Sequence, residues 1–164
     1  MIETIKLADV PEWEGIYAFY DRDPRSAACA YVGETTNLRR RLRQHLVLRN
    51  SSVATGTSVA GLRVDLIRFV QWWDHDDFDS EDKRLAAELV AFDVLDPTLR
   101  SRAGIREVAM ELSQRKAFRR KMHAVFEGGP SGRLQVQGLT DLAAEIADLR
   151  QRVAELEDQL RAER

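Results

Sequence analysis

Residues 15–33, GIYAFYDRDPRSAACAYVG, contain two short β-prone runs, GIYAFY at 15–20 and ACAYVG at 28–33. The segment between them, DRDPRSA, holds Asp, Pro and Ser, which favour turns, so the whole stretch predicts a β-hairpin. Alternate residues of a strand share one face. We therefore expect Tyr17 of the first run and Tyr31 of the second to meet across the hairpin.

A helix with charged residues on its apolar side is predicted directly after the hairpin. Thr36 is a suitable N-cap, and the leucines that follow mark one helical stripe, made up of Leu38, Leu42 and Leu48. At about 100° per residue, Arg41 and His45 project from the same stripe. The other arginines of the segment lie away from it, namely Arg39, Arg40 and Arg43. One arginine and one histidine are thus expected to point inward with the leucines.

The next segments predict a loop, a third strand and the start of a second helix. Residues 50–61, NSSVATGTSVAG, are small and polar and predict a mobile loop, with contact to a substrate as one option. Residues 62–73 predict the strand. The acidic stretch 74–83 lacks the ligand spacing and the glycine of an EF-hand calcium loop. It instead predicts the beginning of a helix, capped by Asp79 or Ser80.

The helix predicted over about 81–95 carries a carboxylate among its apolar positions, which are Leu85, Leu89, Phe92 and Leu95. Glu88 falls between the last two. An ionised carboxylate in such a place costs several kcal/mol unless a positive charge meets it. Glu88 is therefore expected either to bind a metal ion or to form a plain buried pair with an arginine, and the helical pattern alone leaves both open.

The remaining chain predicts further helices, a break and a long helix. Pro97 should end the second helix, and 100–126 predicts one or two helices whose inward residues are Ile105, Val108, Leu112, Met122 and Phe126. GGPSG at 128–132 predicts a linker or a sharp turn. We expect an α+β fold with a small three-stranded antiparallel sheet flanked by helices. The expected organisation is one domain over 1–126, a linker over 127–138 and a helix over 139–164.

The C-terminal segment has the pattern of a coiled coil. Its apolar residues recur in steps of three and four: Leu139, Leu142, Ile146, Leu149, Val153, Leu156 and Leu160. β-branched residues at a and leucines at d favour a parallel dimer, in which Arg152 at g would face Glu157 at e of the other chain. We predict a homodimer through 139–164. A hetero-partner helix, or packing against the chain's own domain, would use similar spacing.

Composition limits the classes of function. The net charge of −2 argues against wholesale coating of nucleic acid, yet cationic residues cluster at 39–49 and 115–121, where solvated helix faces are the alternative explanation. The single cysteine, Cys29, permits no intramolecular disulfide, and the three histidines add no zinc-ligand spacing. A cytoplasmic location is expected, with neither a secretion signal nor a membrane span.

These motifs together resemble the GIY-YIG nuclease superfamily over about residues 13–100. The resemblance is carried by GIY at 15–17, YVG at 31–33, Asn37-Leu38 and Arg41 on the next helix, and a later helical glutamate. It implies that Tyr17 and Tyr31 are the paired tyrosines and Arg41 the catalytic arginine. It further implies that His45 stands where relatives place His or Tyr, that Glu88 is the metal-ligating carboxylate, and that Gly33 lets the backbone turn tightly.

The activity implied by this resemblance is a metal-dependent endonuclease that hydrolyses DNA phosphodiester bonds, with RNA as an alternative substrate. Glu88 would hold Mg²⁺ or Mn²⁺, Arg41 would grip the phosphate with two parallel hydrogen bonds, and a tyrosine would be the base, Tyr17 first and Tyr31 second. The expected substrate-binding residues are Gly33, Thr35, Asn37, Arg39, Arg40 and Arg100. Restriction, antiphage defence or DNA repair would be the biological setting.

Two positions depart from the family pattern. Where relatives have an asparagine after the proline, this chain has Arg100, which could hold a phosphate instead. Glu34 stands where many relatives have Lys or Ser, and it adds negative charge near the phosphate path. A second hypothesis is therefore a nucleic-acid-binding adaptor with weak or no cleavage, whose coiled coil recruits a partner. A purely structural interaction protein is the third.

Overall fold

A computed structural model describes residues 6–55, 61–100, 106–137 and 139–162, with backbone alone for 139–145 and 162. The hairpin is confirmed, with β1 (Gly15–Tyr20) antiparallel to β2 (Tyr31–Thr35). In this register Tyr17 lies opposite Gly33, and Phe19 lies opposite Tyr31. Every residue of β1 is buried, because β1 lies between β2 and β3 (Phe69–Trp73) in the sheet.

The sheet has four antiparallel strands in the order β2-β1-β3-β4, one strand more than we predicted. The additional strand, β4 (Gly132–Gln135), lies within residues 127–138, which we predicted to be a linker. GGPSG makes the turn that brings β4 back to the sheet edge, and Leu134 is then buried opposite Val70. Trp72 packs directly over Gly132, where only a glycine leaves room.

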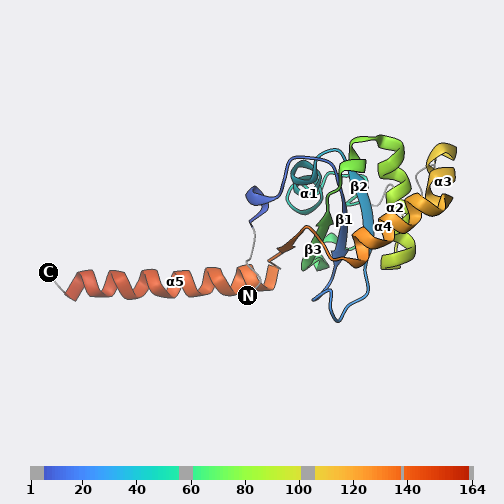
Figure 1. The fold of residues 1–164 in the computed structure, drawn as a ribbon. Coiled ribbons are helices and arrows are strands. Elements are labelled where there is room, and N and C mark those ends of the chain that lie inside the picture. Colours follow the sequence, from blue (N-terminus) through green and yellow to red (C-terminus); the bar gives the residue numbers. More distant parts are fainter. Residues whose placement is uncertain (1–5, 56–60, 101–105, 138, 163–164) are drawn as a thin grey trace.

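Helices cover both faces of the sheet (Figure 1). On one face α1 (Leu38–Leu46) packs over Tyr17, Phe19 and Tyr31. On the other face, α2 (Glu81–Leu95) and α4 (Lys116–Glu127) enclose Ile16, Ala18 and Val32. Short 3-10 helices η1 (Leu7–Asp9), η2 (Val64–Leu66) and η3 (Asp76–Asp79) join these elements. The alternation of β1 therefore sends its tyrosine at position 17 to the α1 side.

Several side-chain predictions for α1 need correction. Asn37, not Thr36, is the N-cap, because its side chain accepts a hydrogen bond from the backbone N–H of Arg40 at 2.8 Å. Leu48 is exposed, since α1 ends at Leu46 and the chain turns away before residue 48. Leu38, Leu42 and His45 are buried as expected.

The predicted inward faces of α2 and α3 (Glu107–Gln114) also differ from the structure. α2 contacts the sheet, α3 and α4, so its most buried positions are mainly small residues that allow close approach: Ala86, Ala87, Val90 and Ala91. Its leucines at 85, 89 and 95 are only partly buried. In α3, Val108 is exposed, and Ala109 and Ser113 face inward instead. Met122 and Phe126 of α4 are buried as predicted, whereas Ile105 lies outside the described residues.

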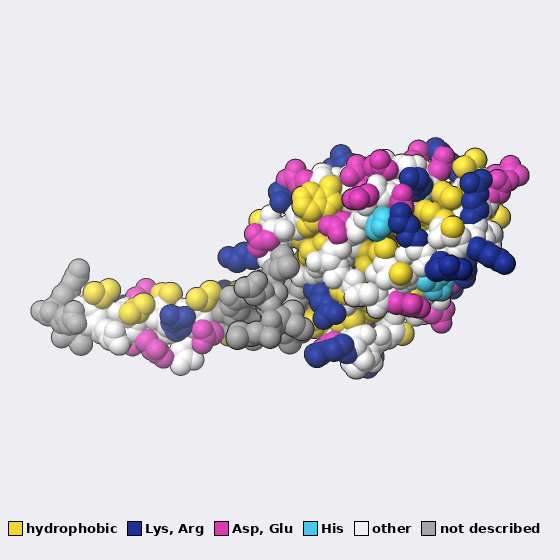
Figure 2. Space-filling view, in the orientation of Figure 1, with side chains coloured by type: hydrophobic (Ala, Val, Ile, Leu, Met, Phe, Trp, Pro, Cys, Tyr) yellow, Lys and Arg dark blue, Asp and Glu magenta, His cyan; other side chains and the backbone are white. Residues whose placement is uncertain are grey.

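The last helix, α5 (Leu139–Ala162), extends alone from the rest of the chain (Figure 1). Its apolar residues whose side chains are described are between 49% and 63% exposed: Ile146, Leu149, Val153, Leu156 and Leu160. Figure 2 shows hydrophobic side chains along this helix. No helix in the described ranges is both long and apolar enough to cross a membrane.

The position of β4 makes a testable prediction about folding. Replacing Leu134, which is 6% exposed, by Ala should lower the free energy of unfolding by about 2 kcal/mol or more, because a buried leucine side chain is lost. Leu48→Ala is the matched control, since Leu48 is 51% exposed. Urea unfolding of the full chain measures both. Equal stability of the two variants would show that β4 is not part of the folded sheet.

Candidate active site

A cluster of aromatic rings joins the hairpin to α1. The Tyr17 and Tyr31 ring centroids are 6.2 Å apart, and the Tyr17 and His45 centroids are 5.4 Å apart. Phe19 packs against Tyr17 and lies edge-on to His45. The hydroxyl of Tyr17 is hydrogen-bonded to Nε2 of His45 at 2.7 Å. The expected meeting of the two tyrosines is thus seen, and the histidine of α1 joins them.

Gly33 makes room for this cluster. It lies within β2, so the tight backbone turn that the family resemblance implied is not its role. A Cβ at this position would lie 2.6 Å from Cζ of Tyr17, closer than real Cβ atoms approach another atom, and 3.0 Å from Cε1 of Tyr31, which is a tight contact. Any residue other than glycine would therefore displace the Tyr17 ring across the hairpin.

His45 is fully buried and uncharged. Its Nδ1 lies 2.6 Å from Oγ of Ser51, so both ring nitrogens have partners. Burial, together with the positive charge of Arg41, lowers the pKa of His45 to about 3. The imidazole is therefore neutral throughout the physiological range and can act through its hydrogen bonds but not as a cation.

Arg41 is half-buried and has no acidic partner among the described residues. Its charge acts on three neighbours, because it lowers the pKa of Tyr17, of Tyr31 and of His45. Arg39, two residues earlier on the helix, behaves differently, since it pairs with Glu12 and donates to the carbonyl oxygen of Val10 at 2.7 Å. Arg41 thus presents an uncompensated guanidinium next to the tyrosines, which is what phosphate binding requires.

Glu88 is the carboxylate that affects the pKa values of Tyr17 and Tyr31 most. Burial and the charge of Glu34 raise its pKa to about 8, although the backbone N–H of Glu34 acts in the opposite direction. Glu88 also raises the pKa of Tyr31, where it is the largest cause after burial, and it raises the pKa of Tyr17. A cation bound at Glu88 would favour the ionised carboxylate and reverse its effect on the tyrosines.

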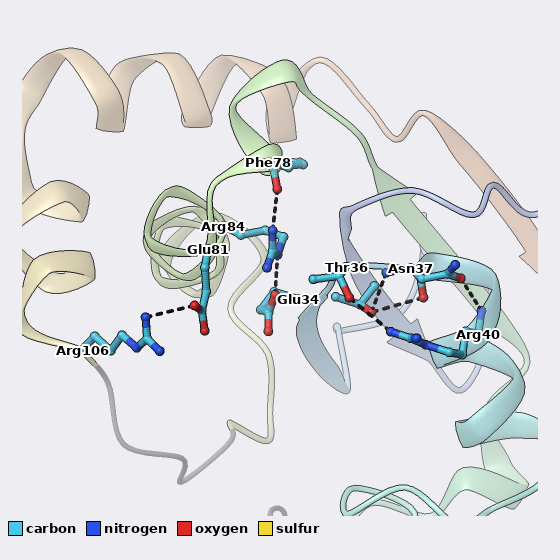
Figure 3. A network of polar contacts seen from close by, with 9 residues as sticks. Glu34, Thr36, Asn37, Arg40, Phe78, Glu81, Arg84 and Arg106 are labelled. Atoms are coloured by element: carbon cyan, nitrogen blue, oxygen red, sulfur yellow. Dashed lines mark hydrogen bonds and ion pairs between the residues drawn. The ribbon is translucent and has the colours of Figure 1, made fainter.

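The buried Glu–Arg pair that we considered for Glu88 is formed by another glutamate. Arg84, one helical turn before Glu88 on α2, is 4% exposed and donates from Nε to Oε2 of Glu34 at 2.6 Å. Its Nη1 donates to the carbonyl oxygen of Phe78 at 2.7 Å (Figure 3). Arg84 therefore fastens α2 to β2 beside the tyrosines. We did not single it out in the sequence, although it lies four residues before Glu88, on the same side of the helix.

The chemistry of Glu88 fits a divalent cation such as Mg²⁺. It offers a hard oxygen donor, it forms no ion pair within the described ranges, and the backbone N–H of Glu34 acts on it as a hydrogen-bond donor. No group of three or more His, Cys, Asp or Glu residues that could hold a metal occurs within the ranges described. A cation at Glu88 would therefore have few protein ligands and would keep most of its water, as Mg²⁺ commonly does.

The predicted substrate-binding residues have different surroundings. The side chains of Thr35 and Asn37 form hydrogen bonds with the backbone. The Thr35 hydroxyl donates to the Asn37 carbonyl and accepts from the Asn37 N–H, and the Asn37 side chain caps α1. Arg40 is exposed, and its guanidinium donates to the Thr36 hydroxyl at 3.2 Å (Figure 3).

Arg100 lies at the C-terminal end of α2. Its guanidinium contacts the carbonyl oxygen of Phe92 at 3.3 Å and Asp96 at 3.4 Å, and it stacks over the Phe92 ring. These contacts compete with a role in holding phosphate. A direct contact between Arg100 and a substrate stays a prediction.

Comparison with known proteins agrees with this geometry. Residues 14–89 match the family model described as the GIY-YIG catalytic domain. No curated protein and no solved structure matches the chain. The matched range begins just before β1 and ends just after Glu88, so it contains both tyrosines, Arg41, His45 and Glu88. Over residues 14–89 the chain is therefore similar to the GIY-YIG catalytic domain, the family whose motifs its sequence resembles.

Proposed function

We propose that the chain is a metal-dependent endonuclease that hydrolyses DNA phosphodiester bonds and leaves 5′-phosphate and 3′-hydroxyl ends. The observation that supports this most directly is the pair Arg41 and Glu88. Neither has an ionic partner in the described part of the chain, and both charges act on the hydroxyl of Tyr31. A guanidinium, a carboxylate and a phenol that interact electrostatically match the needs of a phosphoryl group, a divalent cation and an attacking water.

Glu88 is the residue that we propose holds Mg²⁺ or Mn²⁺. Such an ion, when bound, stabilises negative charge on the phosphate and on the leaving 3′ oxygen. The Arg84–Glu34 pair keeps α2 at a fixed position against β2, so Glu88 is presented from a rigid element. Because Glu34 is already neutralised by Arg84, its charge near the phosphate path is smaller than the sequence suggests.

Arg41 is the residue that we propose binds the scissile phosphate. Its planar guanidinium can make two parallel hydrogen bonds to the non-bridging oxygens, which the ammonium of a lysine cannot. Its positive charge lowers the pKa of both tyrosines, so a phosphate bound to it would lie in reach of their influence.

The tyrosine pair is the proposed base. The sequence favoured Tyr17, but in the structure the Tyr17 hydroxyl is hydrogen-bonded to His45, and Glu88 is the largest cause after burial of the raised pKa of Tyr31. This arrangement supports Tyr31 as the group that accepts the proton of the attacking water. Tyr17 and His45, which are both buried, would then position the Tyr31 hydroxyl without contacting the attacking water themselves.

The first arginine cluster is the proposed path of the DNA backbone. Arg40, Arg43 and Arg49 are exposed and pair with no acidic residue in the ranges described. The second cluster is partly neutralised, because Arg119 pairs with Asp93 at 2.8 Å and Lys121 pairs with Asp77 at 2.5 Å. Phosphates are attracted by local potential and not by net charge, so the α1 side is favoured. RNA offers the same phosphates and is the alternative substrate.

We also propose that α5 pairs with α5 of a second copy as a parallel coiled coil. Isolated, the helix exposes an apolar seam that water disfavours, and the charges beside it are complementary in a parallel pair, with Arg152 facing Glu157 of the other chain. One domain has one active site, so a pair could cut both strands in one encounter. Such paired cutting would suit restriction or antiphage defence, and DNA repair is the other setting we propose.

The alternative function is an adaptor that binds nucleic acid but cleaves it weakly or not at all. The observation that favours it is the position of Arg100, which is engaged at the end of α2 where the family pattern has an asparagine. In that case α5 would recruit a catalytic partner instead of a second copy.

The nuclease proposal predicts the behaviour of two variants. Glu88→Gln and Arg41→Lys should each lower the cleavage rate of duplex, branched and single-stranded DNA in Mg²⁺ or Mn²⁺ by about 100-fold or more, because charge stabilisation of the transition state is lost. Gel assays with labelled substrates measure the rates. Glu81→Gln is the control for α2, since Glu81 is exposed and pairs with Arg106 away from the tyrosines.

Three results would distinguish the functions. Undiminished cleavage by Glu88→Gln would contradict the proposed site. Binding of DNA at low salt without cleavage by the natural sequence would favour the adaptor. No affinity for any nucleic acid would favour the structural interaction protein.

The coiled-coil proposal predicts a dimer mass for the full chain at micromolar concentration. Leu149→Asp should convert it to a monomer, because the substitution places a charge in the seam. Ala147→Asp is the matched control, since position 147 lies outside the seam on the same exposed helix. Sedimentation equilibrium measures all three masses. A monomer mass for the natural sequence would refute self-pairing and favour a hetero-partner.

A further inference from the structure

Ser51, just beyond α1, contacts the site from outside the motifs that define it. It lies near the start of the loop 50–61, for which contact with a substrate was one option, yet it is only 6% exposed. Its Oγ lies 2.6 Å from Nδ1 of His45, on the side of the imidazole opposite Tyr17. Ser51 is therefore the second hydrogen-bond partner of a histidine that is already bonded to Tyr17.

The other hydrogen bonds of Ser51 decide whether Ser51 Oγ or His45 Nδ1 is the donor in this contact. The backbone N–H of Ala54 donates to Oγ of Ser51 at 3.1 Å, so one lone pair of the hydroxyl is occupied. Among the described residues, the only acceptor within reach of the hydroxyl hydrogen is Nδ1 of His45. A buried hydroxyl without an acceptor is costly. The Ser51 hydroxyl therefore donates to Nδ1, and Nδ1 carries no proton.

The single proton of His45 must then lie on Nε2. A neutral imidazole has one donor nitrogen and one acceptor nitrogen, and the hydrogen bond at one nitrogen selects the role of the other. His45 is neutral, as its depressed pKa shows. Nε2 therefore donates to the Tyr17 hydroxyl oxygen at 2.7 Å.

The same donor direction continues from Tyr17 to Tyr31. Since the Tyr17 oxygen accepts from His45, its own hydroxyl hydrogen is free to donate. The centroid of the Tyr31 ring lies 6.2 Å from that of Tyr17, and hydrogen bonding from Tyr17 lowers the pKa of the Tyr31 hydroxyl. Each donor in this series points the same way, from Ser51 through His45 and Tyr17 to the oxygen of Tyr31. Aligned donors of this kind stabilise negative charge at the end of the chain.

We propose that Ser51 is a positioning residue that holds His45 in the Nε2–H tautomer and thereby directs a chain of hydrogen-bond donors onto the oxygen of Tyr31. The role in catalysis rests on the proposed nuclease function, in which Tyr31 is the base. The tautomer itself does not. Ser51 touches neither the substrate nor the reacting atoms and acts through His45 alone.

The tautomer can be measured without any activity. Long-range ¹H–¹⁵N correlation spectra of the full chain at neutral pH report which ring nitrogen of His45 bears the proton. The natural sequence should show protonated Nε2. Ser51→Ala should shift the population toward protonated Nδ1, and Ser51→Thr, which keeps the hydroxyl, should restore Nε2–H. Protonated Nδ1 in the natural sequence would overturn the proposal, even if Ser51→Ala failed to fold.

Kinetics test the consequence for cleavage. Ser51→Ala should lower kcat by about 10- to 100-fold with KM unchanged, the size of effect seen when the outer partner of a functional histidine is removed. Ser51→Thr should recover most of the rate. Ser52→Ala is the control, because Ser52 is the exposed neighbour and should leave kcat unaltered. A rise in KM of about 10- to 100-fold for Ser51→Ala, with kcat unchanged, would overturn the positioning role.

Failure of the two proposals would look different. Protonated Nε2 in a chain that cleaves no nucleic acid would refute the nuclease function and still support the tautomer assignment. Active cleavage with protonated Nδ1 would refute the role of Ser51 and leave the nuclease function intact.

Discussion

The Tyr17 ring lies against the backbone of Gly33, and the rest of the site depends on this contact. The register that places Tyr17 opposite Gly33 brings the Tyr17 hydroxyl over β2, next to Tyr31 and within 2.7 Å of His45. A side chain at position 33 would collide with the ring. One missing Cβ thus fixes the tyrosine pair, the orientation of His45 and, through His45, the contact with Ser51.

Burial and nearby charges together set the pKa values of the two tyrosines. Burial alone holds the pKa of both tyrosines above the ordinary value, and Glu88 raises them further, so the site without a cation contains neutral phenols. Arg41 acts in the opposite direction, and a divalent ion at Glu88 would add to Arg41. The raised pKa of Glu88, about 8, has the same meaning, because this carboxylate is ionised readily only when a positive charge joins it. Glu34 is not a second free carboxylate in the site, because it forms an ion pair with Arg84.

Local patterns predicted most of the elements that carry this site. The hairpin, α1 with an inward His45, and α2 with Glu88 all follow from alternation and helical period, because each has one face toward a core. Other features depend on partners distant in sequence. β4 is short, follows two glycines and exists because β3 and Trp72 accept it, so no periodic signal marks it. Ser51 and Arg84 acquire meaning only from the residues they touch, and Val108 is exposed because α3 packs through small residues.

The location of a bound Mn²⁺ ion tests the central claim most directly. Crystals of the full chain soaked in Mn²⁺ would reveal the ion by its anomalous scattering. We expect one peak at about 2.1 Å from a carboxylate oxygen of Glu88, with water completing its coordination and with Arg41 and Tyr31 facing the same space. Absence of a peak at Glu88 under saturating Mn²⁺, or a peak bound elsewhere in the domain, would contradict the account.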